Sequence, residues 1–259
     1  MRCCLFLLLA VSLSAETLVM GHRGCRALRP ENTIAAFEHA LKVGADVLEL
    51  DVVVTQDNHL VVHHDLDLAG KSVHSMTLAE VRAFDRGGTR SPNFPKQQLI
   101  PGERIPTLAE VLTLAKKRKA RLMIETKVDP AVDPQWFATA VDQQIRQYGV
   151  TSQVMLQSFD HRTLHAMRKL NPEIPLVLLN PRQKLADYIT PARALGSKAI
   201  QMVNVAVVDA DIVKTLKAAN IPIYVGTTDD PAQWKRLIDL KIDGILTDDP
   251  EGLRRLLPR

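Results

Sequence analysis

Short apolar runs that read as strands alternate along this chain with segments that carry the start and stop signals of helices. Each run has the length of a strand buried on both faces. The predicted strands cover residues 18–20, 47–52, 60–64, 122–127, 154–157, 176–179, 199–203 and 221–225. Because parallel strands are joined by crossover helices, this alternation predicts a parallel sheet, and the number of repeats predicts a closed α/β barrel of the TIM (β/α)8 type.

The helix starts are identified by their capping residues. Asn32 is predicted to cap a helix over residues 33–43, which Gly44 ends. Capping boxes or Asp-Pro pairs mark later starts at Thr77, Thr107, Asp133 and Asp230. These starts lie between predicted strands or after the last of them, so the capping signals support the same architecture.

Two segments depart from a regular barrel. Residues 52–59 are too few for a crossover helix, so this segment either doubles back in extended form or forms a hairpin around Asp57-Asn58. Residues 66–104 hold a capped helix and then several glycines and prolines. This second segment is predicted to be an insertion after the third strand, either a cap that shapes the pocket or an inert surface loop.

The length fits one large domain that follows a short leader. The chain has 259 residues, and single barrels of this type typically have about 250. Arg2, the apolar run 5–13 and Ser14-Ala15 predict a signal peptide over residues 1–15, with an amphipathic or buried first segment as the alternative. We therefore expect an exported protein, periplasmic or secreted, whose barrel domain covers residues 16–259.

Charge and composition argue against several classes of partner. The net charge of +4 is small and scattered, and aromatic residues make up 4% of the chain, so no nucleic-acid partner is expected. No apolar stretch after the leader reaches the length of a membrane span, so the mature chain is not expected to insert stably in a membrane. Cys25 is the one cysteine beyond the leader and has no separate base, so neither a disulfide nor a cysteine nucleophile is predicted.

Acidic side chains interrupt two of the apolar strands. Glu49 and Asp51 are two residues apart and therefore share one face of their strand, where two carboxylates can hold one hard cation. Glu125 and Lys127 project together from a later strand, either as a metal ligand with its neighbour or as an ion pair inside the barrel. Oxygen ligands suit Mg²⁺ or Ca²⁺.

Histidines occur at or near the ends of two other strands. His22 and Arg23 follow the first strand, and the alternation of side chains places His64, rather than His63, on the face of Val62. A cation and a guanidinium neutralise a phosphodiester, while two imidazoles move protons to and from its oxygens. The residues thus outline a metal-assisted phosphoryl-transfer site.

Several short motifs occur in a fixed order over roughly residues 18–252. They are His22-Arg23-Gly24, Pro30-Glu31-Asn32-Thr33, Glu49-Leu50-Asp51-Val52, His64-Asp65, Ile105-Pro106-Thr107-Leu108, Glu125-Thr126-Lys127, Ser158-Phe159 and Asp243-Gly244-Ile245-Leu246-Thr247-Asp248. In this order they resemble the signature of the glycerophosphodiester phosphodiesterases, a family of PLC-like phosphodiesterase TIM barrels. The resemblance implies hydrolysis of glycerophosphodiesters, as small-molecule substrates, to glycerol 3-phosphate and an alcohol with a divalent cation.

The resemblance also implies roles for individual residues. It assigns metal binding to Glu49, Asp51 and Glu125, acid-base catalysis to His22 and His64, and phosphate contact to Arg23. Lys127 either contacts the phosphate or orients Glu125. The nucleophile is either water or the substrate's own glycerol hydroxyl. One departure concerns the substrate: Gly226 stands where a tryptophan is usual, which is expected to widen the mouth.

Other functions remain open from the sequence. A lysophospholipase D or phospholipase D relative would act on longer lipids and would need an exposed apolar rim. A catalytically silent binding barrel would retain the shape of the site, although such proteins tend to lack one of the catalytic residues. A barrel that uses Mg²⁺ to stabilise an enolate would need a lysine base, for which Lys127 is the candidate. The oligomeric state is not indicated by the sequence.

Overall fold

The structure, a computed structural model, describes residues 16–180 and 186–257. The predicted signal peptide, residues 1–15, lies outside the described residues. Within the described ranges, the chain contains no helix that is both long and apolar enough to span a membrane.

The central sheet of the described chain is a closed barrel. It has nine strands in the order β1-β11-β10-β9-β8-β7-β6-β2-β3, and β1 also pairs with β2, which closes the ring. The antiparallel β3 (Leu60–Val62) lies outside the ring, which leaves eight parallel strands. These eight are β1 (Leu18–Gly21), β2 (Val47–Val54), β6 (Arg121–Thr126), β7 (Val154–Ser158), β8 (Leu176–Asn180), β9 (Ala199–Met202), β10 (Ile223–Val225) and β11 (Gly244–Thr247). The predicted TIM-type barrel is confirmed.

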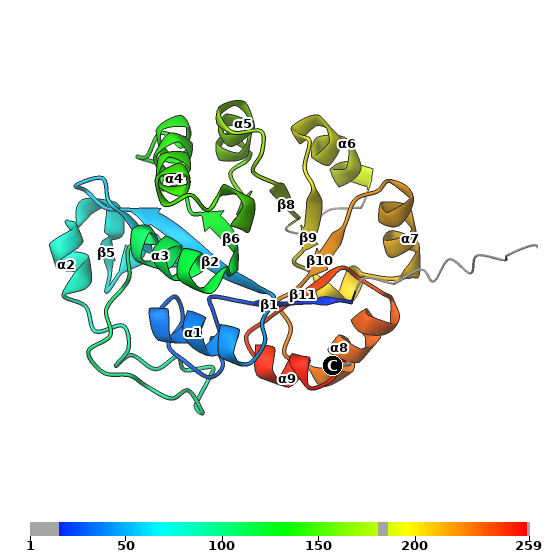
Figure 1. The fold of residues 1–259 in the computed structure, drawn as a ribbon, viewed down its shortest axis with the longest axis horizontal. Coiled ribbons are helices and arrows are strands. Elements are labelled where there is room, and N and C mark those ends of the chain that lie inside the picture. The colour runs from blue at the N-terminus through cyan, green and yellow to red at the C-terminus, as the bar shows by residue number, and fades with distance from the viewer. Residues whose placement is uncertain (1–15, 181–185, 258–259) are drawn as a thin grey trace, which may run out of the picture.

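Helices surround the ring of strands (Figure 1). They are α1 (Ile34–Lys42), α3 (Leu108–Arg118), α4 (Pro134–Tyr148), α5 (His161–Leu170), α6 (Ala186–Leu195), α7 (Ala210–Ala218), α8 (Pro231–Asp239) and α9 (Pro250–Arg254). The capping boxes at Thr77 and Thr107 are both formed, and the Asp133 and Asp230 side chains accept hydrogen bonds from the first turns of α4 and α8. Local capping thus determined where these helices begin.

The prediction for the cap of α1 is wrong. Thr33, not Asn32, is the N-cap, and its hydroxyl accepts a hydrogen bond from the Ala36 amide. Asn32 has a left-handed backbone with φ of 57° and points its amide elsewhere, to Asp51. Both residue types are good caps, so the local sequence does not distinguish between them. The predicted end is confirmed, because Gly44 follows α1 with φ of 92°.

The short segment after β2 forms the hairpin that the sequence left as one of two alternatives. β3 pairs antiparallel with the end of β2, with Val62 opposite Val52, and the Thr55 amide donates to the His59 carbonyl across the turn. The third predicted strand therefore pairs with the end of a barrel strand and is not part of the ring. The ring instead contains β11 (Gly244–Thr247), which the sequence analysis did not predict as a strand. β3 carries the chain to His64 at the carboxyl end of the barrel.

Residues 66–104 contain little regular structure. They hold the two-stranded β4 (Asp67–Leu68) and β5 (Lys71–Ser72), a 3-10 turn at Val73–Ser75 and the short α2 (Leu78–Arg82). The last part of the segment is tied to the loop between β1 and α1. The amide of buried Gln97 donates to the Arg26 and Arg29 carbonyls at 2.7 and 3.0 Å. This insertion therefore buttresses the loop that carries the His22-Arg23 motif.

Side chains that point into the barrel form a small apolar cluster of their own. Its buried members are Met20, Val47, Met123, Val177, Ala199, Tyr224 and Leu246. A much larger core lies between the sheet and the helices and includes Phe37, Leu48 and Phe137. The inner cluster gives the barrel a packed floor, so that any cavity among the strands must lie above it.

Candidate active site

The period of two along each strand places a polar ring above the apolar floor. Two residues beyond Met20 lies His22, and two beyond Val47 and Met123 lie Glu49 and Glu125. A second step of two leads from Glu49 to Asp51 and from Glu125 to Lys127. On the other strands the first step beyond the floor gives Gln157, Leu179, Gln201, Gly226 and Asp248. Most of these residues line one pocket of about 230 Å³ at the carboxyl ends of the strands, together with Arg23, His64, Phe159, Val203, Thr227 and Leu246.

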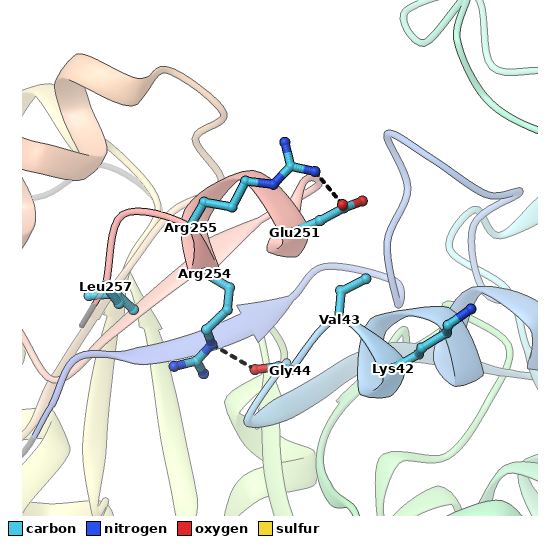
Figure 2. Close-up of a pocket in the computed structure, with 7 residues that line it drawn as sticks. All are labelled: Lys42, Val43, Gly44, Glu251, Arg254, Arg255 and Leu257. Carbon is cyan, nitrogen blue, oxygen red and sulfur yellow. Dashed lines mark hydrogen bonds and ion pairs between the residues drawn. The ribbon is translucent and has the colours of Figure 1, made fainter. Parts of the chain in front are cut away.

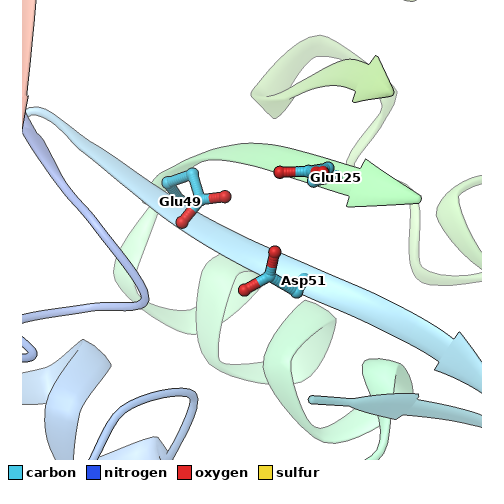
Figure 3. Close-up of side chains that lie close together, drawn as sticks. All are labelled: Glu49, Asp51 and Glu125. Carbon is cyan, nitrogen blue, oxygen red and sulfur yellow. The ribbon is translucent and has the colours of Figure 1, made fainter. Parts of the chain in front are cut away.

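Three carboxylates converge on one wall of this pocket. Glu49 and Asp51 lie on β2, and Glu125 lies opposite Asp51 on the adjacent β6 (Figure 3). One oxygen from each lies within 4.8 Å of the others, and all three side chains are buried. The three predicted metal ligands thus lie close together. They do so because β2 and β6 are adjacent parallel strands whose register pairs Asp51 with Glu125.

The electrostatics of these carboxylates reflect burial and mutual repulsion. Burial, followed by the charges of Asp51 and Glu125, raises the pKa of Glu49 well above its usual value. Burial and Asp51 raise the pKa of Glu125 to about 7, although Lys127 opposes this. Burial also disfavours the charged form of Asp51, but Lys127 and Arg23 outweigh it and hold the pKa of Asp51 below its usual value. The wall therefore has more negative charge than its two cationic neighbours neutralise.

Lys127 and Arg23 flank the carboxylates from two sides. The Lys127 ammonium lies 2.5 Å from Glu125 Oε1 and 3.3 Å from Asp51 Oδ1. Arg23 donates its backbone amide to Glu49 at 2.9 Å, and its guanidinium lies 3.4 Å from Asp51 Oδ2. Lys127 thus contacts Glu125, as one of its two predicted roles requires, and both cations lie beside the pocket.

His22 is held by a buried carboxylate that the sequence analysis did not single out. Its Nδ1 lies 2.7 Å from Oδ1 of Asp248, a residue two positions beyond Leu246 at the end of β11. Arg23 Nε donates to His22 Nε2 at 3.2 Å, so this nitrogen is the acceptor and Nδ1 carries the proton. Asp248 is itself fixed, since its backbone amide donates to Asp229 at 2.8 Å.

The second histidine has a similar but exposed partner. Nδ1 of His64 lies 2.7 Å from Asp65 Oδ1, and the Asp65 side chain is 64% exposed against 6% for Asp248. Burial lowers the pKa of His64. His63 lies away from the pocket, with its Nε2 3.1 Å from the Asp67 carbonyl. Of the two histidines, the one that the alternation argument selected is thus the one that lines the pocket.

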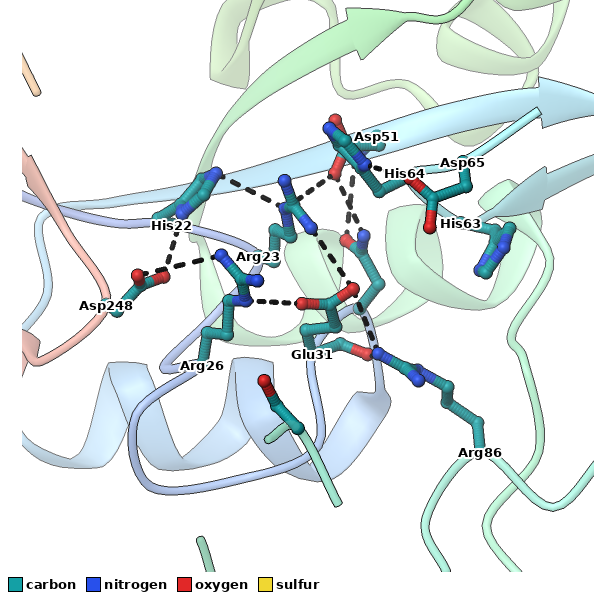
Figure 4. A network of polar contacts seen from close by, with 12 residues as sticks. His22, Arg23, Arg26, Glu31, Asp51, His63, His64, Asp65, Arg86 and Asp248 are labelled. Atoms are coloured by element: carbon teal, nitrogen blue, oxygen red, sulfur yellow. Dashed lines mark hydrogen bonds and ion pairs between the residues drawn. The ribbon is translucent and has the colours of Figure 1, made fainter. Parts of the chain in front are cut away.

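A network of arginines around Glu31 supports Arg23 from below (Figure 4). Arg23, Arg26 and Arg86 lie 3.1, 2.6 and 2.9 Å from the Glu31 carboxylate, and Arg86 comes from the insertion. Burial favours the neutral form of Glu31, but Arg23, Arg86 and Arg26 outweigh it and lower its pKa. Arg26 also faces Asp248 at 3.8 Å, so one network reaches both Arg23 and His22.

Several functional residues were missed by sequence reasoning. Asp248 and Glu31 fix His22 and Arg23, and the Asn32 amide donates to Asp51 Oδ2 at 2.9 Å. All three lie within motifs that were recognised, but a motif gives no partner for a side chain. Cys25, for which no nucleophilic role was predicted, is buried, and burial raises the pKa of its thiol to about 12. Ser158 is buried in the barrel wall.

The remaining wall of the pocket is uncharged. It is formed by Gln157 on β7, Leu179 on β8, Gln201 on β9, and Gly226-Thr227 after β10. Gly226 has φ of 147°, and a Cβ placed there would lie 2.2 Å from the Leu246 carbonyl oxygen. No larger residue therefore fits at Gly226 without a shift of the backbone.

A larger cavity of about 500 Å³ lies near the amino ends of the strands (Figure 2). Both of its arginines already have partners. Arg254 donates to the Gly44 carbonyl at 2.9 Å, and Arg255 pairs with Glu251. Since barrel active sites lie at the carboxyl ends of the strands, and the motif residues lie there too, we place the functional site in the smaller pocket.

Comparison with known proteins identifies the family of this chain. The sequence model of the glycerophosphoryl diester phosphodiesterase family matches residues 22–252. A glycerophosphodiester phosphodiesterase of Caldanaerobacter subterraneus is 32% identical over 247 residues, which cover 93% of this chain and 98% of the relative.

Solved structures give the same result. A glycerophosphodiester phosphodiesterase from Parabacteroides distasonis is 27% identical with a TM-score of 0.75, covering 93% of this chain and 97% of that one. A phosphodiesterase from Oleispira antarctica, solved with the product sn-glycerol-3-phosphate, shares the fold with a TM-score of 0.84 at 22% identity, covering 93% and 96%. With a barrel, a three-carboxylate wall and a family match that spans nearly the whole described chain, the protein belongs to the glycerophosphoryl diester phosphodiesterase family.

Proposed function

We propose that this protein hydrolyses glycerophosphodiesters to sn-glycerol 3-phosphate and an alcohol, with a divalent cation and a pair of histidines. Membership of the family supports the class of reaction. One observation carries the finer proposal: Glu49, Glu125 and both predicted histidines line the same pocket as Arg23 and Lys127. Asp51 lies directly beside the two glutamates, and all three carboxylates are buried.

The carboxylate wall fits a hard cation. Glu49, Asp51 and Glu125 would hold it, because their oxygens lie within 4.8 Å of one another and oxygen donors suit Mg²⁺ and Ca²⁺. The raised pKa of Glu49 supports this fit, since burial and two carboxylate neighbours leave its charge uncompensated. When bound, such a cation neutralises the phosphodiester and polarises it toward attack.

The protein side chains supply charge stabilisation and proton transfer. Arg23 and Lys127 offer positive charge to the phosphate oxygens, which gain charge in the transition state. One imidazole of the His22 and His64 pair takes the proton of the nucleophile, and the other protonates the oxygen of the leaving alcohol. Asp248 keeps His22 in one tautomer, with Nε2 free of a proton. The same pair serves whether water or the glycerol hydroxyl attacks.

The first experiment measures release of glycerol 3-phosphate from glycerophosphocholine and glycerophosphoethanolamine, with chelator, Mg²⁺ or Ca²⁺. We expect cation-dependent release that is lost in Glu49→Ala and His22→Ala. Matched controls are Glu173→Ala and His165→Ala, which make the same changes at exposed positions outside the pocket. Turnover that survives chelation, or that survives in both pocket variants, would contradict the proposal.

A second candidate substrate class is favoured by one observation. Phe159 and Val203 line the pocket and are 49% and 37% exposed, so the pocket has apolar side chains at its rim. Such a rim suits the acyl chain of a lysophospholipid. Release of choline from lysophosphatidylcholine, with no turnover of glycerophosphocholine, would favour this lysophospholipase D activity.

We further propose that the protein is exported to the periplasm or secreted. The proposal rests on the leader sequence, in which Arg2 precedes an apolar run and Ser14-Ala15. Sequencing the amino terminus of the protein recovered from outside the cytoplasm tests it. A mature chain that begins near Glu16 is expected, and a chain that keeps Met1 inside the cell would refute it.

A further inference from the structure

Gln201 lies in the uncharged wall of the pocket without a hydrogen-bond partner for its side-chain oxygen. The residue is 3% exposed, and Oε1 has no partner among the described residues. Burying an amide oxygen without a hydrogen-bond partner destabilises the folded protein. A ligand that donates a hydrogen bond to this amide would remove that cost. Gln201 also lines the pocket in which the phosphodiester is proposed to bind.

Gln157, the other glutamine of the pocket, differs in one respect. Its Oε1 also has no partner among the described residues, but its Nε2 donates to Glu49 Oε1 at 3.3 Å, so its amide is oriented by the carboxylate wall. Gln201 lies two strands farther round the ring on β9, with Leu179 of β8 between them. Both glutamines therefore belong to the uncharged wall, Gln157 at its border with the carboxylates and Gln201 farther from them.

The neighbours of Gln201 restrict the kind of group that it can bind. Leu179 and Val203 are apolar, and Gly226 on the adjacent strand has no side chain to fill the space. A cationic head group would find no carboxylate on this wall. A hydroxyl group fits, because it both donates and accepts, and the terminal amide presents either its oxygen or its nitrogen by rotation about its last torsion.

We infer that Gln201 is a specificity-determining residue that hydrogen-bonds a hydroxyl group of the substrate's glycerol moiety. This inference takes its ligand from the proposed function. In this arrangement the charged wall binds the phosphate and Gln201 selects the glycerol that is attached to it. A phosphodiester without hydroxyl groups would leave the amide unpaired, and a site built to hydrogen-bond a hydroxyl group discriminates against analogues that lack it.

The test compares two ligands that differ only in hydroxyl groups. Binding of sn-glycerol 3-phosphate and of propyl phosphate is measured by calorimetry with Mg²⁺ present, for the wild type and Gln201→Met. We expect the wild type to bind glycerol 3-phosphate roughly 10–100-fold more tightly than propyl phosphate. Gln201→Met should lose most of that preference and keep its affinity for propyl phosphate, which shows that the pocket is intact.

Two controls keep the outcome interpretable. Gln143→Met makes the same change on the exposed face of α4 and should leave the preference unaltered. Gln201→Leu is a second variant that removes the amide, and it replaces Gln201→Met if the methionine variant has a lowered melting temperature.

The inference is overturned if the wild type shows no preference, if the preference survives in both variants, or if both ligands lose affinity equally. Absence of turnover on glycerophosphocholine, with the binding preference intact, would instead refute the proposed reaction and leave the role of Gln201 standing.

Discussion

The pocket has two walls that the same barrel builds in different ways. On β1, β2 and β6 the wall consists of charged side chains that hold one another, with His22, Glu49, Asp51, Glu125 and Lys127 in contact with their own or neighbouring partners. On β8, β9 and β10 the wall is uncharged and is defined by the shapes of its residues. The difference indicates that chemistry is concentrated on one side and selection of the substrate on the other.

In the charged wall, a substitution that removes a charge should reduce activity far more than one that changes the shape of a side chain. Asp51→Asn keeps the size of the side chain but removes a buried carboxylate that contacts Lys127 and Arg23. We expect kcat/KM to fall by about 10³-fold or more, because a bound cation contributes several kcal/mol of charge stabilisation. The measurement is steady-state turnover over a range of Mg²⁺ concentrations, with Glu173→Gln as the exposed control. Full activity restored by excess Mg²⁺ would show that Asp51 contributes affinity for the ion only.

Glu31→Gln tests whether the charged wall depends on the arginine network beneath it. Removing a buried carboxylate that faces three arginines, one buried and two half-buried, should cost roughly 3–5 kcal/mol of unfolding free energy at pH 7. The pKa of Glu31 is lowered in the folded state, so its stabilisation is present above the unfolded value and is lost as the pH falls through the folded value. Urea unfolding at pH 7 and at lower pH measures the difference between variant and wild type.

The difference in unfolding free energy between Glu31→Gln and the wild type should shrink as the solution is acidified. A difference that stays constant with pH would mean that packing, not charge, is the contribution of Glu31. Glu103→Gln is the matched control, because burial raises the pKa of Glu103 and the opposite pH trend is expected for it.

Gly226→Ala tests whether the uncharged wall is set by shape. The new Cβ would lie 2.2 Å from the Leu246 carbonyl, so we expect a loss of about 1–3 kcal/mol from overpacking, in addition to the strain of an unfavourable φ. Gly70→Ala is the control, since Gly70 also has a positive φ of 81° but no atom within 4 Å of the added Cβ. Thermal unfolding of both variants separates the two costs. Equal losses of stability in the two variants would show that the backbone around Gly226 shifts at little cost to accept a Cβ.

The two histidine pairs allow the sharpest comparison within the charged wall. Asp248→Asn breaks a buried hydrogen bond to His22, and a charged bond of this kind contributes about 1.5–3 kcal/mol, which corresponds to roughly 10–150-fold in kcat. Asp65→Asn makes the same change at the exposed pair, where about fivefold or less is expected. Equal effects of the two variants on kcat and on its pH profile would show that burial does not distinguish them.

The sequence predicted most of the fold, for reasons that are local. Strand and helix periods, the capping boxes at Thr77 and Thr107, and the short connection after Asp51 are properties of neighbouring residues, and they led to the barrel and to its hairpin. The alternation along β2 correctly placed Glu49 and Asp51 on one face. Local signals failed in two places. They assigned no strand to residues 244–247, which form β11, and they did not distinguish Asn32 from Thr33 as the cap of α1.

Contacts between distant parts of the chain were decided by the tertiary structure alone. Asp248 reaches His22 from 226 residues away because β11 pairs with β1 when the barrel closes. Arg86 reaches Glu31 because the insertion folds back on the loop before α1. Gln201 carried no motif, and it acquires a place in the site only because an inward-facing residue of β9 shares the pocket with residues of β2 and β6. The sequence shows which side chains a strand carries. Which residues these side chains contact depends on the register of the strands and on closure of the barrel, and both follow from packing across the whole ring.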